Sequence, residues 1–174
     1  MANNPEQFEK AKEITEPMLY GTLQNGFVCH KPYDQEKIFC TSWASYVRYA
    51  ETFEDCNFHF DIEAYHNNLR YRFDVKHRTL PTKSSNFSIE KKCIDFYESV
   101  NIKDDEYQRC FFAFALDNGN EYTGEFLRVK VEEVLNISDK YKQWKKLNSD
   151  NPYCCISEEI LKQQPSAIII RSDI

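Results

Sequence analysis

Residues 58–78, FHFDIEAYHNNLRYRFDVKHR, contain the pattern that decides the fold of this chain. Apolar and polar residues alternate on both sides of Asn67-Asn68, and asparagine tolerates the positive φ angles that a two-residue hairpin loop requires. The stretch therefore predicts a β-hairpin with its turn at Asn67-Asn68. In the register set by that turn, Asp61 lies directly opposite Asp74.

The predicted hairpin has one polar and one apolar face, because successive side chains of a strand point to opposite sides of the sheet. The polar face collects His59, Asp61, Glu63, Tyr65, Arg70, Arg72, Asp74 and Lys76, and the apolar face collects Phe60, Ile62, Ala64, Leu69, Tyr71, Phe73 and Val75. Two opposed carboxylates repel each other by up to about 1 kcal/mol on an exposed sheet. A divalent cation between them reverses the sign of that interaction, so the pair indicates a metal site. The alternative is an exposed sheet that carries ordinary cross-strand ion pairs, such as Glu63–Arg72 and Asp61–Lys76.

An acid on one strand, a short turn and then Asp74-Val75-Lys76 on the next strand resemble the core motif of the PD-(D/E)XK nuclease superfamily. The resemblance covers roughly residues 40–131, and Phe60 stands where many family members have a proline. A second acid-x-Lys sequence, Glu90-Lys91-Lys92, lies in a segment with a helical pattern and has no facing acid. It is most simply a solvated surface.

The resemblance implies a catalytic centre on the hairpin. Asp61 and Asp74 would bind Mg²⁺ or Mn²⁺ together with the main-chain carbonyl of Val75, because hard oxygen ligands suit these ions. Lys76 would stabilise negative charge in the transition state. Its ammonium group lies beside two carboxylates and is expected to stay protonated, which favours an electrostatic role over that of a general base.

Many members of the family add a glutamate from a preceding helix. Glu51 is the first candidate, because it closes a predicted helix shortly before Asp61, and Glu13 and Glu16 are the alternatives. Contacts to the phosphates of a substrate are expected from basic residues in the loop after the Asp-x-Lys strand, namely His77, Arg78 and Lys83.

Periodicity along the rest of the chain predicts helices alternating with strands. Helices are expected from Pro5, with Asn4 as N-cap and Pro17 ending or kinking the helix, and over residues 36–52, 88–100 and 138–147. Strands are expected over residues 27–29, 107–116, 122–131 and 168–170. These elements predict an α/β (α+β mixed) fold with a central mixed β-sheet flanked by helices, as in the restriction-endonuclease-like core. They form one domain over residues 1–174.

Composition is that of a globular protein, with 174 residues, 41% hydrophobic and 15% aromatic. No stretch reaches the ~18 unbroken apolar residues of a membrane span, and no basic region followed by an apolar stretch opens the chain. The seven cysteines are an odd number, so they are expected to be reduced thiols in a cytoplasmic protein.

The net charge of −6 argues against a general nucleic-acid coat protein, which is normally basic. It is compatible with a nuclease, because the acidic metal ligands contribute to it. The sequence therefore predicts a metal-dependent endonuclease that hydrolyses phosphodiester bonds in DNA or RNA. No interaction with a membrane is expected. The sequence does not decide between a monomer and a homodimer. The alternative is a non-catalytic acidic protein on the same fold that binds a partner, for example as an inhibitor or anti-defence factor.

Overall fold

The computed structural model describes residues 5–50, 60–100, 102, 104–140 and 152–173. Eight strands form one sheet in the order β2-β1-β10-β8-β7-β5-β4-β3, and β6 pairs with β9 in a small second sheet. The elements are α1 (Pro5–Asn25), β1 (Phe27–His30), β2 (Cys40–Ser42), β3 (Tyr46–Tyr49), β4 (Ile62–His66), β5 (Leu69–Lys76), β6 (Asn86–Glu90), α2 (Lys91–Ser99), α3 (Asp104–Tyr107), β7 (Cys110–Asp117), β8 (Tyr122–Lys130), α4 (Val131–Lys140), β9 (Tyr153–Ser157), α5 (Glu158–Lys162) and β10 (Ile168–Ser172).

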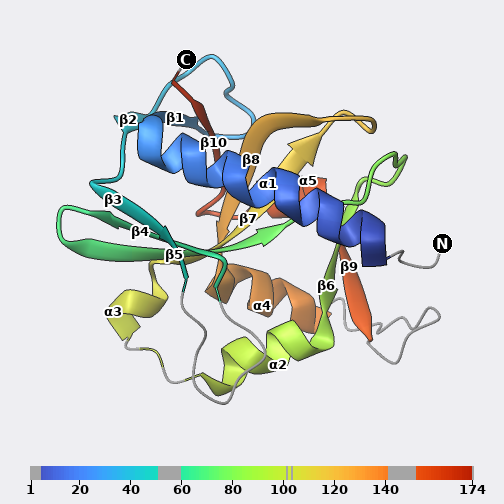
Figure 1. Ribbon diagram of the computed structural model, residues 1–174. Helices are drawn as coiled ribbons and strands as arrows, with labels where there is room; N and C mark the ends of the chain where they lie inside the picture. The colour runs from blue at the N-terminus through green and yellow to red at the C-terminus, as the bar shows by residue number, and fades with distance from the viewer. Residues whose placement is uncertain (1–4, 51–59, 101, 103, 141–151, 174) are drawn as a thin grey trace.

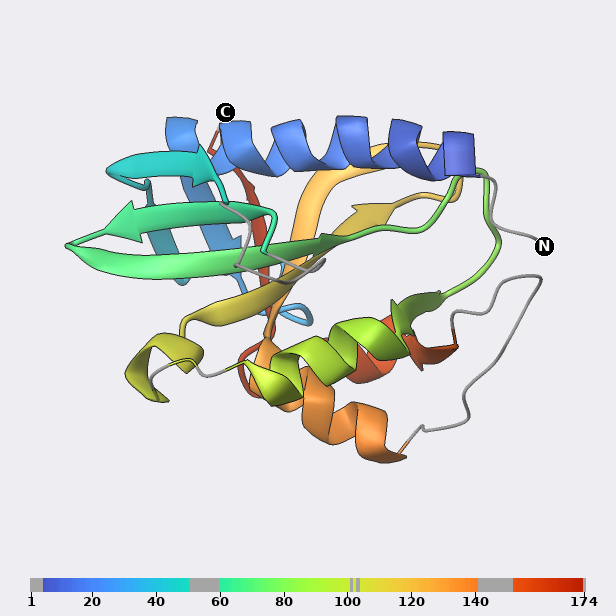
Figure 2. The same cartoon turned by 60° about the horizontal axis from the view of Figure 1, so that its bottom comes forward.

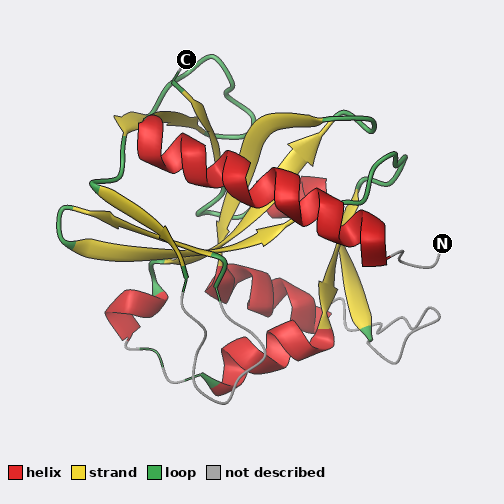
Figure 3. Ribbon diagram, in the orientation of Figure 1, coloured by secondary structure: helices red, strands yellow, loops and turns green. Residues whose placement is uncertain are grey.

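Helices cover both faces of the large sheet (Figures 1 and 3). Figure 2 shows α1 running along one face, with α2 and α4 on the other. The central pair β5–β7 is parallel, whereas β4–β5 and β7–β8 are antiparallel. The predicted fold class, a central mixed β-sheet flanked by helices, is confirmed.

The hairpin of β4 and β5 has the predicted turn and register. Asn67 and Asn68 have φ angles of 51° and 64°, and the register pairs Ile62 with Phe73 at the far end of the ladder. The N–H of Asp61 extends this ladder by donating to the carbonyl of Phe73 at 2.8 Å.

The prediction for Phe60 is wrong, because the chain bends at Asp61 and the strict alternation of side chains stops there. The ring of Phe60 packs against Tyr97 of α2, with ring centroids 5.2 Å apart. Ile62 and Ala64 instead face α1.

Two hydrophobic cores share the central strand β7. Phe111, Ala113 and Ala115 belong to the core under α1, and the alternate residues Phe112 and Phe114 belong to the core under α2 and α4. A strand buried on both faces needs apolar residues throughout. This explains the run CFFAFAL at residues 110–116.

Helix α1 buries Ala11, Thr15, Leu19 and Leu23, at the spacing of four that places them on one face. The helix continues through Pro17 to Asn25, so the expectation that it ends at the proline is wrong. Buried residues on both sides of Pro17 hold the helix against the sheet, and the φ of +105° at Gly26 then ends it.

The described part of the predicted helix at residues 36–52 is not helical, because it contains the edge strands β2 and β3. Aromatic and β-branched residues at near-helical spacing also favour strands, and here pairing with neighbouring strands determines the outcome. The predicted helix at 138–147 begins earlier, as α4 from Val131, and residues 141–151 lie outside the described residues.

The expectation of reduced thiols is wrong for one pair, because Cys29 of β1 and Cys40 of β2 form a disulfide. These residues are directly opposite each other in the antiparallel ladder. Among the described helices, none combines the length and apolar character needed to span a membrane.

Candidate active site

Asp74 lies at the centre of a buried polar cluster between β5 and α2. Its side chain is only 5% exposed. Lys76, two residues along the same strand, approaches Oδ1 with its Nζ at 3.1 Å. The hydroxyl of Tyr97 donates to Oδ2 at 2.5 Å, and the thiol of Cys93 lies 3.6 Å from the same oxygen. Because Cys93 and Tyr97 are one helical turn apart, α2 presents both groups to the carboxylate.

Lys76 is held in its charged form. Burial alone would lower the pKa of Lys76, but the negative charges of Asp74 and Asp61 raise it above the ordinary value. An ammonium group that keeps its proton cannot act as a general base at neutral pH. It provides a fixed positive charge beside the carboxylates, as the sequence predicted.

Asp61 lies next to this cluster, where the chain enters β4. Its Oδ2 accepts the backbone N–H of Val75 at 2.7 Å, and its carboxyl group lies near enough to that of Glu16 on α1 for each to influence the pKa of the other. Burial and the negative charges of Asp74 and Glu16 raise the pKa of Asp61 to about 8. Because each carboxyl group influences the pKa of the other, Asp61 and Glu16 titrate as an interacting pair.

The alternative prediction, that the polar face carries ordinary cross-strand ion pairs, is confirmed for Glu63 but not for Asp61. Glu63 lies 3.5 Å from Arg72 and 2.7 Å from Arg48. Lys76 pairs with Asp74, and within the described residues Asp61 forms no ion pair with a cation. Among the described residues, Asp61 therefore has acidic neighbours and no paired cation, and a bound cation could take that place.

Of the three candidate glutamates, Glu16 lies near Asp61 in the described part of the chain. Glu51, the first candidate from the sequence, lies outside the described residues, and Glu13 is exposed. Glu16 borders the buried stripe of α1, next to Thr15, whereas Glu13 lies on the opposite side of the helix. This position relative to the stripe is the sequence signal that could have ranked Glu16 first.

The donor chemistry of the cluster fits a hard divalent cation. Asp61 and Asp74 offer carboxylate oxygens, and the charge of Asp74 adds to the effect of burial in raising the pKa of Asp61. Among the described residues, no three His, Cys, Asp or Glu side chains gather closely enough to hold an ion by themselves. A metal would therefore need main-chain oxygens, water or substrate as further ligands, as the predicted contribution of the Val75 carbonyl implies.

The three predicted phosphate contacts have different surroundings. His77 packs against Phe8 of α1, with ring centroids 4.9 Å apart. Burial and the positive charges of Lys76 and Lys12 lower the pKa of His77 to about 4, so the ring is neutral at pH 7 and supplies no charge to a phosphate. Lys83 is exposed and stays a candidate.

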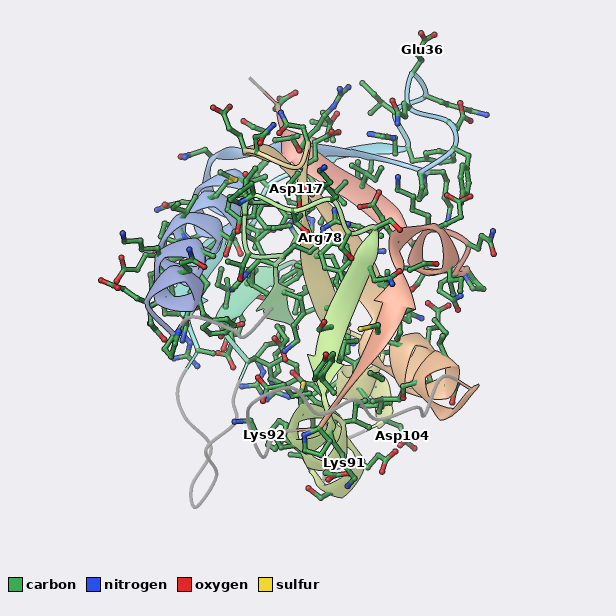
Figure 4. The ribbon with its side chains drawn as sticks, turned by 90° about the vertical axis from the view of Figure 1, so that its right-hand side faces the viewer. Glu36, Arg78, Lys91, Lys92, Asp104 and Asp117 are labelled. Atoms are coloured by element: carbon green, nitrogen blue, oxygen red, sulfur yellow. A yellow bond between two sulfur atoms is a disulfide. The ribbon has the colours of Figure 1, made fainter. Side chains whose placement is uncertain are left out.

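Arg78, the second predicted phosphate contact, has a guanidinium that is buried and engaged within the protein. Nε lies 2.9 Å from Asp117 and Nη2 lies 2.8 Å from Glu158, while Nη1 donates to the carbonyl of Ser84 at 3.1 Å. Figure 4 shows Arg78 and Asp117 close together. Arg78 therefore links the loop after β5 to β7 and α5.

Lys12 is a positive charge near the site that sequence reasoning missed. Its Nζ lies 4.0 Å from Glu16, one helical turn away, and its side chain is 42% exposed. Its charge contributes to the lowered pKa of His77. Lys12 is therefore a partly exposed cation at the border of the acidic cluster.

Comparisons with known proteins give one structural likeness. No family model and no curated protein matches this chain. Among solved structures, the chain is similar to D212, a nuclease from a fusselovirus, with 16% sequence identity and a TM-score of 0.40. The likeness covers 66% of this chain and 67% of D212.

Proposed function

We propose that this protein is a metal-dependent nuclease that hydrolyses phosphodiester bonds of DNA or RNA. The observation that carries the proposal is the cluster of Asp61, Asp74 and Lys76, in which two carboxylates interact and a permanently charged lysine contacts one of them. These are the residues through which the hairpin resembles the PD-(D/E)XK motif. Glu16 adds the helix-borne glutamate that this motif often includes.

Asp61, Asp74 and the carbonyl of Val75 would hold Mg²⁺ or Mn²⁺. Such an ion, when bound, polarises a phosphoryl oxygen and lowers the pKa of a bound water. Tyr97 and Cys93 fix the orientation of the Asp74 carboxylate. The ammonium group of Lys76 stabilises the negative charge that develops on the phosphate.

The substrate would approach from the side of α1 and of the loop after β5. Lys12 and Lys83 are the exposed or partly exposed cations that support binding of phosphates there. His77 and Arg78 are not part of this proposal, because one is neutral and the other is engaged in ion pairs.

The test is cleavage of plasmid, single-stranded DNA and RNA by the full chain, in Mn²⁺ and in EDTA. Asp74→Ala and Lys76→Ala should each lower Mn²⁺-dependent cleavage by about a hundredfold or more, because each removes a group at the reacting centre. Asp95→Ala is the matched control, since Asp95 is an exposed acid on α2 that pairs with Lys91. Equal cleavage in all variants, or cleavage that EDTA leaves unchanged, contradicts the proposal.

A thermal-shift measurement separates a missing substrate from a missing metal site. Mn²⁺ should raise the melting temperature of the wild type, since a ligand that binds only the folded state stabilises it. The shift should disappear in Asp74→Ala and persist in Asp95→Ala. No shift in the wild type would argue against the metal site.

A non-catalytic protein that binds a partner is the second candidate, and exposed aromatic residues favour it. Trp43, Tyr46 and Tyr49 are 62%, 58% and 51% exposed, and all lie on or beside the edge strands β2 and β3. Exposed apolar side chains along a sheet edge are typical of interaction surfaces. Absence of both metal-dependent cleavage and a Mn²⁺ shift would favour this second function.

A further inference from the structure

A pocket of about 160 Å³ lies on the face of the large sheet that α1 only partly covers. Its lining is mostly apolar and includes Leu23, Phe73, Ile168 and Ile170. None of the acidic residues of the candidate active site lines it. This pocket is therefore separate from the acidic cluster between β5 and α2, and an inference about it does not depend on the proposed nuclease.

Two basic side chains line the pocket, His66 and Arg128, and the arginine lies in the middle of β8. Its guanidinium lies over the ring of Phe111, 4.4 Å from the centroid. Nη2 makes a long hydrogen bond of 3.4 Å to the carbonyl of Ser166. Nε is buried and has no hydrogen-bond partner among the described residues.

No carboxylate in the described part of the chain forms an ion pair with Arg128. Glu133 is an acid whose charge Arg128 senses, but the carboxylate oxygens of Glu133 accept the N–H of Ser166 at 3.1 and 3.2 Å and also its hydroxyl. Burial lowers the pKa of Arg128 to about 10. The guanidinium is thus a largely buried cation whose counter-ion the described protein does not supply.

We propose that this pocket binds a small carboxylate with an apolar body about the size of a benzene ring, and that its carboxylate pairs with Arg128. A buried charge without a partner is strongly unfavourable, and a guanidinium offers a planar fork of donors that matches a carboxylate. A cavity of about 150 Å³ with an apolar lining is large enough for benzene. The size and chemistry of the pocket therefore agree.

Other occupants fit the pocket less well. Inorganic phosphate is strongly hydrated, and an apolar lining with a single arginine cannot replace its water. A neutral apolar ligand would leave the positive charge of Arg128 without a counter-ion. Trp43, which also lines the pocket and is 62% exposed, has an aromatic face available to a bound ring.

The experiment uses the full chain and the probe 4-fluorobenzoate, observed by ¹⁹F NMR, with 4-fluorobenzamide as the neutral isostere. The carboxylate should bind with a Kd of about 1 mM or tighter, as suits a ligand of this size. The amide should bind at least about tenfold more weakly, because it lacks the charge-assisted pair. Equal binding of the two probes, or no saturation by the carboxylate up to ~10 mM, overturns the proposal.

Two variants locate the binding. Arg128→Met should weaken binding of 4-fluorobenzoate by about tenfold or more, whereas Arg171→Met should leave it unchanged, because Arg171 lies on the neighbouring strand β10 and does not line the pocket. Since Arg128 packs on Phe111 and its loss can unfold the chain, Ser42→Phe is the second variant. It fills the pocket from β2 and keeps the arginine. Unchanged affinity in folded Arg128→Met or in Ser42→Phe overturns the proposal.

Discussion

Asp61 carries an electrostatic cost in the folded protein. Its pKa rises from 3.8 to about 8, through burial and the negative charges of Asp74 and Glu16. Because the folded state holds this proton more tightly than the unfolded chain, stability without metal falls as the pH rises from 3.8 towards about 8. Below that window both states are protonated, and above it the full cost is present.

Asp61→Asn should remove this pH dependence, because asparagine cannot ionise but can still accept the N–H of Val75. In EDTA, the variant should match the wild type near the low end of the window and exceed its free energy of unfolding by about 1 kcal/mol or more above the high end. Urea denaturation across this pH range measures the difference. If the free energy of unfolding changed with pH in the same way in variant and wild type, the pKa of Asp61 would not be perturbed. Asp95→Asn is the control at an exposed acid.

For single residues, the sequence predicted positions correctly where one local element, such as the hairpin, determines them. Asp61, Asp74 and Lys76 come together because one hairpin register places them. The ion pairs of Arg78 could not be predicted, because its partners Asp117 and Glu158 are distant in the sequence and no local pattern shows that a charged side chain is buried. Basic residues after a catalytic motif can be structural ion-pair partners as readily as phosphate contacts.

We expect helix α1 to contribute to the chemistry as well as to packing, through Glu16. Glu16→Gln should lower Mn²⁺-dependent cleavage by about tenfold or more, because it removes an acid whose charge influences the pKa of Asp61. Glu13→Gln is the matched control, since Glu13 is exposed on the same helix. If both variants cleave equally, Glu16 has no role in the site. The rise in melting temperature caused by Mn²⁺ can be compared between the two variants in the same way, without a substrate.

The ion pairs of Arg78 join three elements. Arg78→Ala should destabilise the protein by about 3–5 kcal/mol, because it leaves the side chain of Asp117, which is 3% exposed, without its partner. Lys83→Ala, in the exposed loop nearby, should change stability by less than about 0.5 kcal/mol. Urea denaturation of both variants measures the two changes in the free energy of unfolding. A small loss in Arg78→Ala would mean that its ion pairs contribute little.

Elements were predicted well where one local pattern dominates. The hairpin, β7, β8 and α2 follow from alternation, continuous burial or helical periodicity. The edge strands β2 and β3 were mistaken for a helix, because aromatic residues fit either period and only pairing with a neighbouring strand decides between them. Strand β9 was missed for a related reason, since its partner β6 lies far away in the sequence.

At the scale of the whole molecule, strand order is what the sequence could not supply. The parallel pairing of β5 with β7 places the hairpin between the edge strand β3 and β7, the strand that both cores share. Periodicity reports which face of a strand is buried but not which strand lies beside it. The mixed sheet flanked by helices was therefore predictable as a class, while its topology was not.

The shared strand β7 predicts that the chain unfolds as one cooperative unit. Leu19→Ala weakens the core under α1, and Ile156→Val weakens the core under α2 and α4, both at fully buried positions. The first should cost about 2–5 kcal/mol and the second about 0.5–1.5 kcal/mol. Because β7 belongs to both cores, each variant should shift the whole unfolding curve. Far-UV and near-UV circular dichroism should then report coincident transitions in urea, and a variant that moves only one signal would reveal two separately stable units.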